Sequence, residues 1–292
     1  MKKGGTVVPP SNFQFVNDQK PMNTEKLTKN PRGRAHDARA RAYENKIVLN
    51  VLIACEESQA ECREFRLLGH NAYSCDIQSC KKKGNPAWHI KADVTPLLQG
   101  QTSFTTQDGK KHKVSHWDLI IAHPPCTYLC KVGSLHLYKN PDTNHDVLGL
   151  KKDFNWDRYQ KLKAAREFFY KCLQAKAPYL AVENPIPMKL AQLPRPTTYA
   201  CPSWFGVKYT KKTLYWLRGL PPLMAEFVYS NATEFVKASR GKYRSRTFPQ
   251  MAQAIAKQWS EAIIEDIKSG RYQPTYKPPH RKPQDDNNRP SN

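Results

Sequence analysis

The stretch Trp117-Asp-Leu-Ile-Ile-Ala-His-Pro-Pro-Cys126 decides the fold that we expect for this chain. Its apolar run from Leu119 to Ala122 has the length of a strand buried on both faces of a parallel sheet. The prolines end that strand, because proline donates no ladder hydrogen bond and keeps the preceding residue extended. Cys126 is therefore predicted on a stiff turn beyond the carboxyl end of a strand, where open α/β sheets bind ligands. The alternative is that Cys126 is simply buried, as free cysteines often are.

Other apolar runs alternate with helical patterns along the chain, which favours an α/β fold with a doubly wound, mostly parallel sheet. The expected strands are 48–54, 71–76, 117–122, 179–182 and 212–217, with a short element at 92–94, and the expected helices are 56–68, 157–175 and 248–267. Residues 99–115 are predicted to form a surface loop or hairpin. Residues 127–156 are predicted to form a long loop that closes over a site like a lid.

The composition indicates a polyanionic partner. The chain has 292 residues, is 39% hydrophobic and carries a formal net charge of +22, with a pI near 9.7. This charge favours nucleic acid as the partner. Residues 1–46 are predicted to be a basic, mostly disordered arm that either touches phosphates or only solubilises the chain, and residues 270–292 a disordered tail. Residues 47–269 form the expected catalytic domain.

The eight cysteines and the hydropathy exclude other classes of protein. Neither a C-x-x-C pair nor a signal peptide is present, so we expect a reducing, cytoplasmic compartment rather than a secreted disulfide scaffold. Zinc binding by Cys75 and Cys80 with nearby histidines is an alternative, but the spacing fits no common site, and no metal is expected. No apolar run approaches the about 18 residues that a membrane span requires.

Four predicted strands end in residues that carry chemistry, and the ends of parallel strands meet at one edge of a sheet. Ala54-Cys-Glu-Glu-Ser58 follows the first strand, and Asp76 ends the second. An acid about 20 residues after the first strand commonly accepts hydrogen bonds from the ribose of a nucleoside cofactor. Cys126 and Glu183 follow the next two strands.

A thiol and a carboxylic acid on neighbouring strands are the two groups that substitution at pyrimidine C5 requires. Thiolate addition to C6 makes C5 nucleophilic, and an acid at N3 stabilises the charge that develops. The alternative for Glu183 is that it caps a helix or pairs with a surface lysine.

The stretch of residues from about 48 to 262 resembles DNA (cytosine-5-)methyltransferases, most closely their compact phage and prophage branch. The segments that carry the resemblance are Ile53-Ala-Cys-Glu-Glu-Ser58, Trp117-Asp-Leu-Ile-Ile-Ala-His-Pro-Pro-Cys-Thr-Tyr-Leu129, Ala181-Val-Glu-Asn-Pro185, Leu214-Tyr-Trp-Leu-Arg-Gly-Leu-Pro-Pro222 and Ser245-Arg-Thr-Phe-Pro249. The second segment is the most specific, because a Pro-Pro-Cys turn followed by Glu-Asn at a later strand end is unusual by chance.

The resemblance implies the Rossmann-like fold of S-adenosylmethionine-dependent methyltransferases and transfer of a methyl group to C5 of cytosine in double-stranded DNA. Cys126 would attack C6 and Glu183 would contact N3 of a base flipped out of the duplex, with the loop 127–156 closing over it. The residues implied in donor binding are Ala54, Cys55, Glu56 and Glu57 at the methionine end, Asp76 at the ribose, Asp93 near the adenine, and Pro124.

The chain departs from the family's pattern in two places. Cys55, Glu56 and Glu57 stand where the family's first motif has glycines. The target-recognition segment, residues 223–247, is very short, so low sequence specificity or a short recognition site is expected. The residues expected to contact DNA are Lys211 or Lys212, which loosely match the family's Arg-bearing motif, and Arg240, Lys242, Arg244 and Arg246.

Two other functions remain open from the sequence. One is a catalytically silent nucleic-acid-binding protein with the same fold, and the other is a different pyrimidine-modifying enzyme. The large positive charge disfavours a free nucleotide as substrate. Methylation of an amino group is also disfavoured, because a cysteine rather than an aromatic residue follows the two prolines. For the favoured function we expect a monomer in the cytoplasm of a bacterium or a phage-infected cell.

Overall fold

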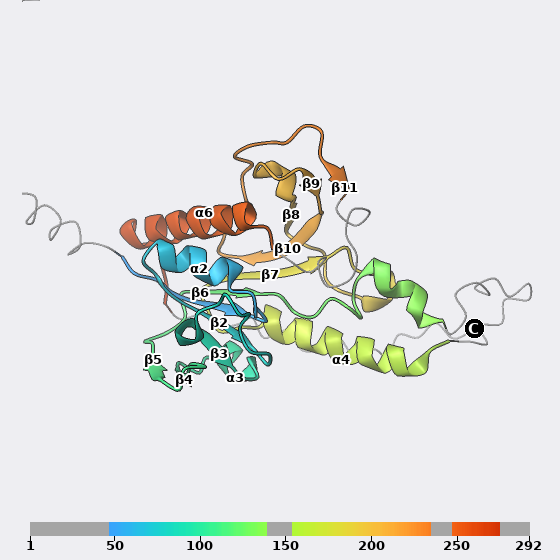
Figure 1. Cartoon of the computed structure of the whole chain (residues 1–292), viewed down its shortest axis with the longest axis horizontal. Helices are drawn as coiled ribbons and strands as arrows, with labels where there is room; N and C mark the ends of the chain where they lie inside the picture. The colour runs from blue at the N-terminus through green and yellow to red at the C-terminus, as the bar shows by residue number, and fades with distance from the viewer. Residues whose placement is uncertain (1–46, 139–153, 235–246, 275–292) are drawn as a thin grey trace, which may run out of the picture. The chain divides into compact units, whose positions relative to one another are not determined.

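A seven-stranded sheet is the centre of the computed structural model, which describes residues 47–138, 154–234 and 247–274 (Figure 1). In spatial order its strands are β3 (His89–Lys91), β2 (Asn71–Asp76), β1 (Asn50–Ala54), β6 (Leu119–Ala122), β7 (Tyr179–Pro185), β10 (Thr213–Arg218) and β8 (Thr198–Ala200). The strands from β3 to β7 are all parallel, whereas β10 is antiparallel to both β7 and β8. The fold is therefore α/β with a mostly parallel sheet, as the sequence predicts.

The sheet changes winding direction between β1 and β6. Without the separate hairpin of β4 (Ser103–Thr105) and β5 (Lys111–Lys113), the parallel strands follow the order 3-2-1-4-5 of doubly wound sheets. The loops after β1 and β6 diverge at such a switch point, and the crevice between them lies at the carboxyl edge of the sheet. The fold therefore places the ends of the two motif-bearing strands at the position where doubly wound sheets bind ligands.

Helices cover both faces of the sheet. Figure 1 shows α2 (Ala60–Leu67) and α6 (Pro249–Lys268) on one face, and α3 (Thr95–Leu98) and α4 (Trp156–Leu173) on the other. Successive strand residues alternate between the two cores: Ile53 packs with the α2 and α6 side and Leu52 with the α3 and α4 side, both fully buried. Burial on both faces explains why the strands read as continuous apolar runs.

Several elements differ in position from the sequence predictions. The third strand lies at 89–91 rather than 92–94, since the single 3-10 turn Pro86–Trp88 leads directly into it. Helix α2 begins at Ala60 rather than 56, because Cys55 and Gln59 adopt left-handed backbone conformations with φ of 62° and 57°. The hairpin expected within 99–115 is confirmed. The expected loop 127–156 contains the 3-10 helix η2 (Lys131–Leu137), and its residues 139–153 lie outside the described part.

The chain beyond α6 also differs from the disordered tail that the sequence predicts from position 270. Tyr272 stacks on Tyr179 with ring centroids 6.0 Å apart, and its hydroxyl hydrogen-bonds to Asp118. Residues 270–274 therefore continue the folded unit because an aromatic side chain anchors them. The predicted arm 1–46 and the remainder of the tail, 275–292, lie outside the described residues.

The recognition segment 223–247 is described only in part. Its β11 (Thr233–Glu234) pairs in parallel with β9 (Tyr209–Thr210), and residues 235–246 lie outside the described part. Within the three described ranges, no helix combines the length and the apolar character that crossing a bilayer would demand.

Candidate active site

The turn after β1 reaches its shape without the glycines of the family's motif. Cys55 itself adopts the left-handed conformation, and the backbone amides of Cys55 and Glu56 donate to the carbonyl oxygen of Cys75 at 2.7 and 3.2 Å. A side chain in this conformation costs roughly 1–2 kcal/mol, which glycine would avoid. The substitution therefore makes the turn more costly but leaves the chain able to form it.

Two acids in this turn have structural partners that sequence reasoning did not anticipate. The buried Glu56 carboxyl accepts hydrogen bonds from the amides of Glu61 and Cys62 at 2.7 and 3.4 Å, and so caps the first turn of α2. Burial, followed by the charge of Glu61, raises the pKa of Glu56 to about 8. Glu57 forms an ion pair with Lys81 at 2.6 Å. These carboxyl groups were expected at the methionine end of a donor; in the structure both have protein partners, and their role toward a donor stays a prediction.

The ends of β1, β2 and β3 gather the other expected donor residues. Burial raises the pKa of the Cys55 thiol, and the nearby charges of Asp76 and Asp93 raise it further. The Asp76 side chain accepts from the amide of Gln78 at 2.8 Å, and partial burial raises its pKa. Asp93 is exposed and accepts from the amide and hydroxyl of Thr95 at 2.9 and 2.8 Å. The structure thus brings Cys55, Asp76 and Asp93 together.

The carboxyl edge of the sheet has two halves: the first half comprises the ends of β1, β2 and β3, and the second half the ends of β6 and β7. Backbone contacts connect the two halves. The amide of His123 donates to the carbonyl oxygen of Ala54 at 2.9 Å, and both Ala54 and Pro124 are buried. The loops after β1 and β6 are therefore fixed to each other at the switch point of the sheet.

The turn that carries Cys126 is braced from two sides. The amides of Leu129 and Cys130 both donate to the carbonyl oxygen of Cys126, at 3.0 and 2.9 Å. The segment after β7 holds the end of this turn, since the amide of Met188 donates to the carbonyl oxygen of Leu129 at 2.8 Å. Cys126 is half-buried beyond the end of β6, as the sequence predicts.

Arg158 on α4 is a second brace, and no signal in the sequence identifies it. Its guanidinium donates to the carbonyl oxygen of Thr127 at 3.0 Å and lies 5.0 Å from the ring centre of Tyr128. Gly133 allows this approach, because a Cβ at that position would lie 2.7 Å from the Thr127 oxygen and 2.9 Å from Nη2 of Arg158.

A second thiol shares the charge of the candidate nucleophile. The Cys126 thiol hydrogen-bonds to the sulfur of Cys130, which raises the pKa of Cys126, and burial and Glu183 raise it further. The same hydrogen bond, together with backbone amides of Gly133 and Val132, lowers the pKa of Cys130 to about 6. The four-residue spacing of these cysteines is the signal that would have found the pair.

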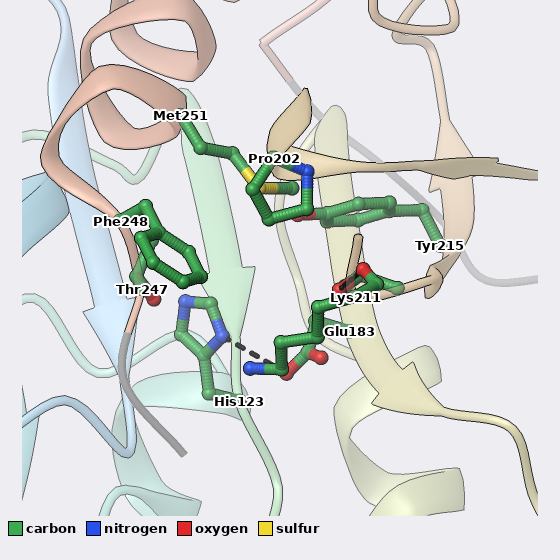
Figure 2. Close-up of a pocket in the computed structure, with 9 residues that line it drawn as sticks. His123, Glu183, Pro202, Lys211, Tyr215, Thr247, Phe248 and Met251 are labelled. Atoms are coloured by element: carbon green, nitrogen blue, oxygen red, sulfur yellow. Dashed lines mark hydrogen bonds and ion pairs between the residues drawn. The ribbon is translucent and has the colours of Figure 1, made fainter. Parts of the chain in front are cut away.

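Glu183 lies near the carboxyl end of the neighbouring strand β7, which runs to Pro185, three residues beyond the predicted end at 182, and it belongs to a charged cluster (Figure 2). Its Oε2 lies 3.4 Å from Nδ1 of His123, whose Nε2 lies 3.1 Å from the buried carboxylate of Glu61. Burial opposes ionisation of Glu183, but the hydrogen bond from His123 and the charge of Lys211 outweigh it and lower its pKa. Burial likewise opposes the imidazolium of His123, and the two glutamates outweigh it and raise its pKa. Sequence reasoning singled out neither His123 nor Glu61.

A small, open pocket lies over this cluster. Figure 2 shows Glu183 and Lys211 on one side, with Phe248 and Met251 of the α6 region closing the other. The remaining lining residues are His123, Pro202, Thr213, Tyr215 and Thr247. The pocket therefore combines a carboxylate and two cationic groups with an apolar wall, which suits a flat, polar heteroaromatic ring.

The residues expected to contact DNA or metal have separate positions. Lys211 lines the pocket, whereas Lys212 is exposed and lies 4.3 Å from the ring centre of Tyr199. The four basic residues between 240 and 246 lie outside the described part. In the described ranges no three His, Cys, Asp or Glu side chains are grouped so as to hold a metal ion, and the Cys75 thiol donates to the Ala92 carbonyl oxygen at 3.5 Å.

No family model and no curated protein matches this chain. The interpretation of the site therefore depends on its own residues and on their geometry.

Proposed function

We propose that the protein transfers a methyl group from S-adenosylmethionine to C5 of cytosine in double-stranded DNA, through a covalent adduct with Cys126. The observation that carries this proposal is the pairing of Cys126 and Glu183. Cys126 follows β6 and Glu183 lies near the carboxyl end of the adjacent parallel strand β7, close enough to act electrostatically on the thiol. Nucleophilic catalysis at a pyrimidine requires a thiolate and an acid in this relation.

The residues at the ends of β1 and β2 fit the methyl donor. The Cys55 turn lies at the switch point of the sheet, and Asp76 keeps a half-buried carboxyl where doubly wound folds bind a ribose. Asp93 lies beyond the third strand on the same edge. S-adenosylmethionine would supply an electrophilic methyl carbon bonded to a sulfonium sulfur.

Cys126 and Glu183, at the ends of β6 and β7, would carry out the replacement of the C5 proton by a methyl group. The Cys126 thiolate adds to C6, and the electron pair of the C5–C6 double bond becomes available at C5 for bond formation to the methyl carbon. Glu183 hydrogen-bonds at N3 and stabilises the charge on the ring. Loss of the C5 proton to a base then restores the double bond, and the bond between C6 and the Cys126 sulfur breaks to release the thiolate.

Lys211 supports this chemistry and the choice of a polyanionic substrate. Its charge favours the thiolate of Cys126. A DNA strand would bring phosphates to this cationic edge, consistent with the formal net charge of +22.

A catalytically silent DNA-binding protein is the second candidate. It is favoured by one feature of the site: the hydrogen bond to Cys130 and burial both raise the pKa of the Cys126 thiol. A nucleophile that retains its proton reacts slowly, because the thiolate is the reactive form. Catalysis therefore requires that Cys126 lose its proton once the base and the donor are bound.

The test uses duplex DNA that contains 5-fluorocytosine, together with methyl-labelled S-adenosylmethionine. Fluorine at C5 does not leave as a proton, so a C5 methyltransferase remains covalently bound to the base. We expect a denaturation-resistant protein–DNA adduct that requires the donor and is absent in Cys126→Ala. Salt-sensitive DNA binding without an adduct would establish the silent binder instead. Label on an amino nitrogen of the DNA would contradict the proposed reaction.

A further inference from the structure

His123 connects two carboxylates that are far apart in the sequence. Glu61 comes from α2 and Glu183 from β7, and the imidazole lies between them with its two nitrogens 3.1 and 3.4 Å from their Oε2 atoms. The His123 side chain is 15% exposed and that of Glu61 is fully buried. An imidazole between two carboxylates has a donor for each only when both nitrogens carry protons.

Among the described residues, His123 is the ion-pair partner of the Glu61 carboxylate. Its Oε1 is buried and has no hydrogen-bond partner among the described residues. A buried carboxylate is costly unless an opposite charge or hydrogen-bond donors compensate it. Glu56, a neighbouring acid, has a pKa that burial and the charge of Glu61 raise, so its protonated form is favoured. His123 is therefore the compensating charge for Glu61.

The arrangement resembles a carboxylate–histidine pair that serves a third group. In such a pair a buried acid orients the imidazole and stabilises its charged form, while the other ring nitrogen exchanges a proton with the reacting side chain. Here Glu61 is the buried acid and Glu183, which lines the pocket, is the third group. Figure 2 shows the imidazole of His123 beside Glu183 at the wall of the pocket.

We propose that His123 is a positioning residue that fixes the Glu183 carboxylate and stores the proton that Glu183 passes to N3 of the pyrimidine, with Glu61 as the buried countercharge. This inference rests on the proposed function, because it assigns the proton source for that reaction. Its structural half, a charged His123 between two carboxylates, is independent of methyl transfer.

The proton balance closes within the cluster. The Nδ1–H bond of His123 breaks and an O–H bond forms on Glu183, which leaves a neutral imidazole whose Nε2–H still donates to Glu61. The O–H bond of Glu183 then breaks as the N3–H bond of the ring forms, and the negative charge created by thiolate addition is neutralised. The same steps run in reverse when the thiolate leaves.

Charged and titratable groups face His123 from several elements. They are Glu61 from α2, Glu56 and Glu57 from the turn before α2, Glu183 from β7, and Lys211 and Tyr215 beside the pocket. The residues that the α6 region contributes to the pocket wall, Thr247, Phe248 and Met251, carry no charge. Glu61 is therefore the partner whose removal should change the protonation of His123 most.

The first measurement does not depend on activity. In the DNA-free protein, nitrogen NMR of His123 should show both ring nitrogens protonated at about pH 8, well above an ordinary histidine. In Glu61→Gln, which keeps a hydrogen-bond acceptor but removes the charge, the His123 titration should move at least about one pH unit lower. A neutral His123 at about pH 7 in the wild-type protein would overturn the inference, whatever the protein does to DNA.

The second measurement compares two isosteric variants in single-turnover methylation. His123→Asn keeps a donor near the Nδ1 position and His123→Gln one near Nε2, but neither stores a proton. Both should bind DNA as the wild type does and lose about 10²-fold or more in rate. Wild-type rates should fall as the pH rises through the His123 pKa, and Glu61→Gln should move this fall to lower pH.

The outcomes separate the two proposals. An unchanged rate and pH profile in His123→Asn, with methylation intact, would contradict the relay while leaving the proposed function in place. A charged His123 in a protein that forms no adduct would instead contradict the proposed function and leave the structural half of the inference standing. Loss of DNA binding in parallel with rate would reduce His123 to a purely structural role and overturn the relay.

Discussion

The two halves of the carboxyl edge are built on different principles. At the ends of β1 to β3, the acids Glu56 and Glu57 have protein partners, and the shape of the backbone at Cys55 is the distinctive feature. At the ends of β6 and β7, the side chains act on one another electrostatically across a pocket, and the turn is braced from α4. Under the proposed function, the first half would hold the donor by the shape of its backbone, and the side chains of the second half would change charge during the reaction.

The largest effect should come from the two thiols of the second half. Cys126→Ala should lower methyl transfer by roughly 10³-fold or more, because the nucleophile is lost. Cys130→Ala should retain transfer, since it removes the hydrogen bond that holds the proton on Cys126. Adduct formation on 5-fluorocytosine DNA checks both variants. An adduct that survives in Cys126→Ala and disappears in Cys130→Ala would show that Cys130, and not Cys126, is the nucleophile.

The next effect concerns the acid of the same half. Glu183→Gln should reduce single-turnover methylation by about 10²- to 10³-fold, because an amide stabilises developing charge on the ring less well. DNA affinity should change little, as salt-dependent binding titrations would show. Equal losses in rate and in affinity would make Glu183 a structural residue.

A smaller effect is expected in the first half, where Asp76 is the proposed ribose partner. Asp76→Asn should weaken binding of S-adenosylmethionine by about 10- to 100-fold, since a hydrogen bond to a charged group contributes about 1.5–3 kcal/mol. Titration calorimetry measures the affinity, with Asp93→Asn as the exposed comparison on the same edge. Unchanged affinity in Asp76→Asn would exclude this carboxylate from the donor site.

Glu56 offers a test of the same half by pH. Its pKa is raised from 4.5 to about 8, so the folded state favours the protonated acid. Its contribution to stability is complete below the unfolded pKa and is lost as the pH rises toward the folded pKa. Glu56→Gln should remove this loss and flatten the decline in unfolding free energy over that range by about 1 kcal/mol or more. Urea unfolding at several pH values checks it, and an identical decline in both proteins would contradict the assignment.

The smallest effect should come from the strained turn. Cys55→Gly removes a left-handed side chain, which gains roughly 1 kcal/mol, but it also increases the entropy of the unfolded chain and deletes a half-buried thiol. We therefore expect a change in stability below about 1 kcal/mol and a donor affinity within a few-fold of wild type. A large loss of donor affinity would mean that the thiol itself, rather than the backbone, contacts the donor.

The sequence by itself determined where most strands of the sheet lie and where the turn that carries Cys126 begins. Strands buried on both faces are continuous apolar runs, so β1, β2, β6 and β7 could be located from local pattern alone. The prolines after Ala122 identified the turn, and with it Cys126. Both inferences use information that lies within a few residues of the position in question.

Only the tertiary structure decided which charges meet. Glu61 and His123 are 62 residues apart and His123 and Glu183 are 60 residues apart, so no local periodicity connects them. The capping of α2 by Glu56 was also hidden, because it depends on the left-handed turn that brings this carboxyl group to the amides of Glu61 and Cys62. The reversal of β10 was equally hidden, because alternation of strands and helices does not specify strand direction. The pattern of apolar residues along a short stretch predicts which side chains are buried. The pKa of a buried group instead depends on neighbours that only packing brings within a few ångströms.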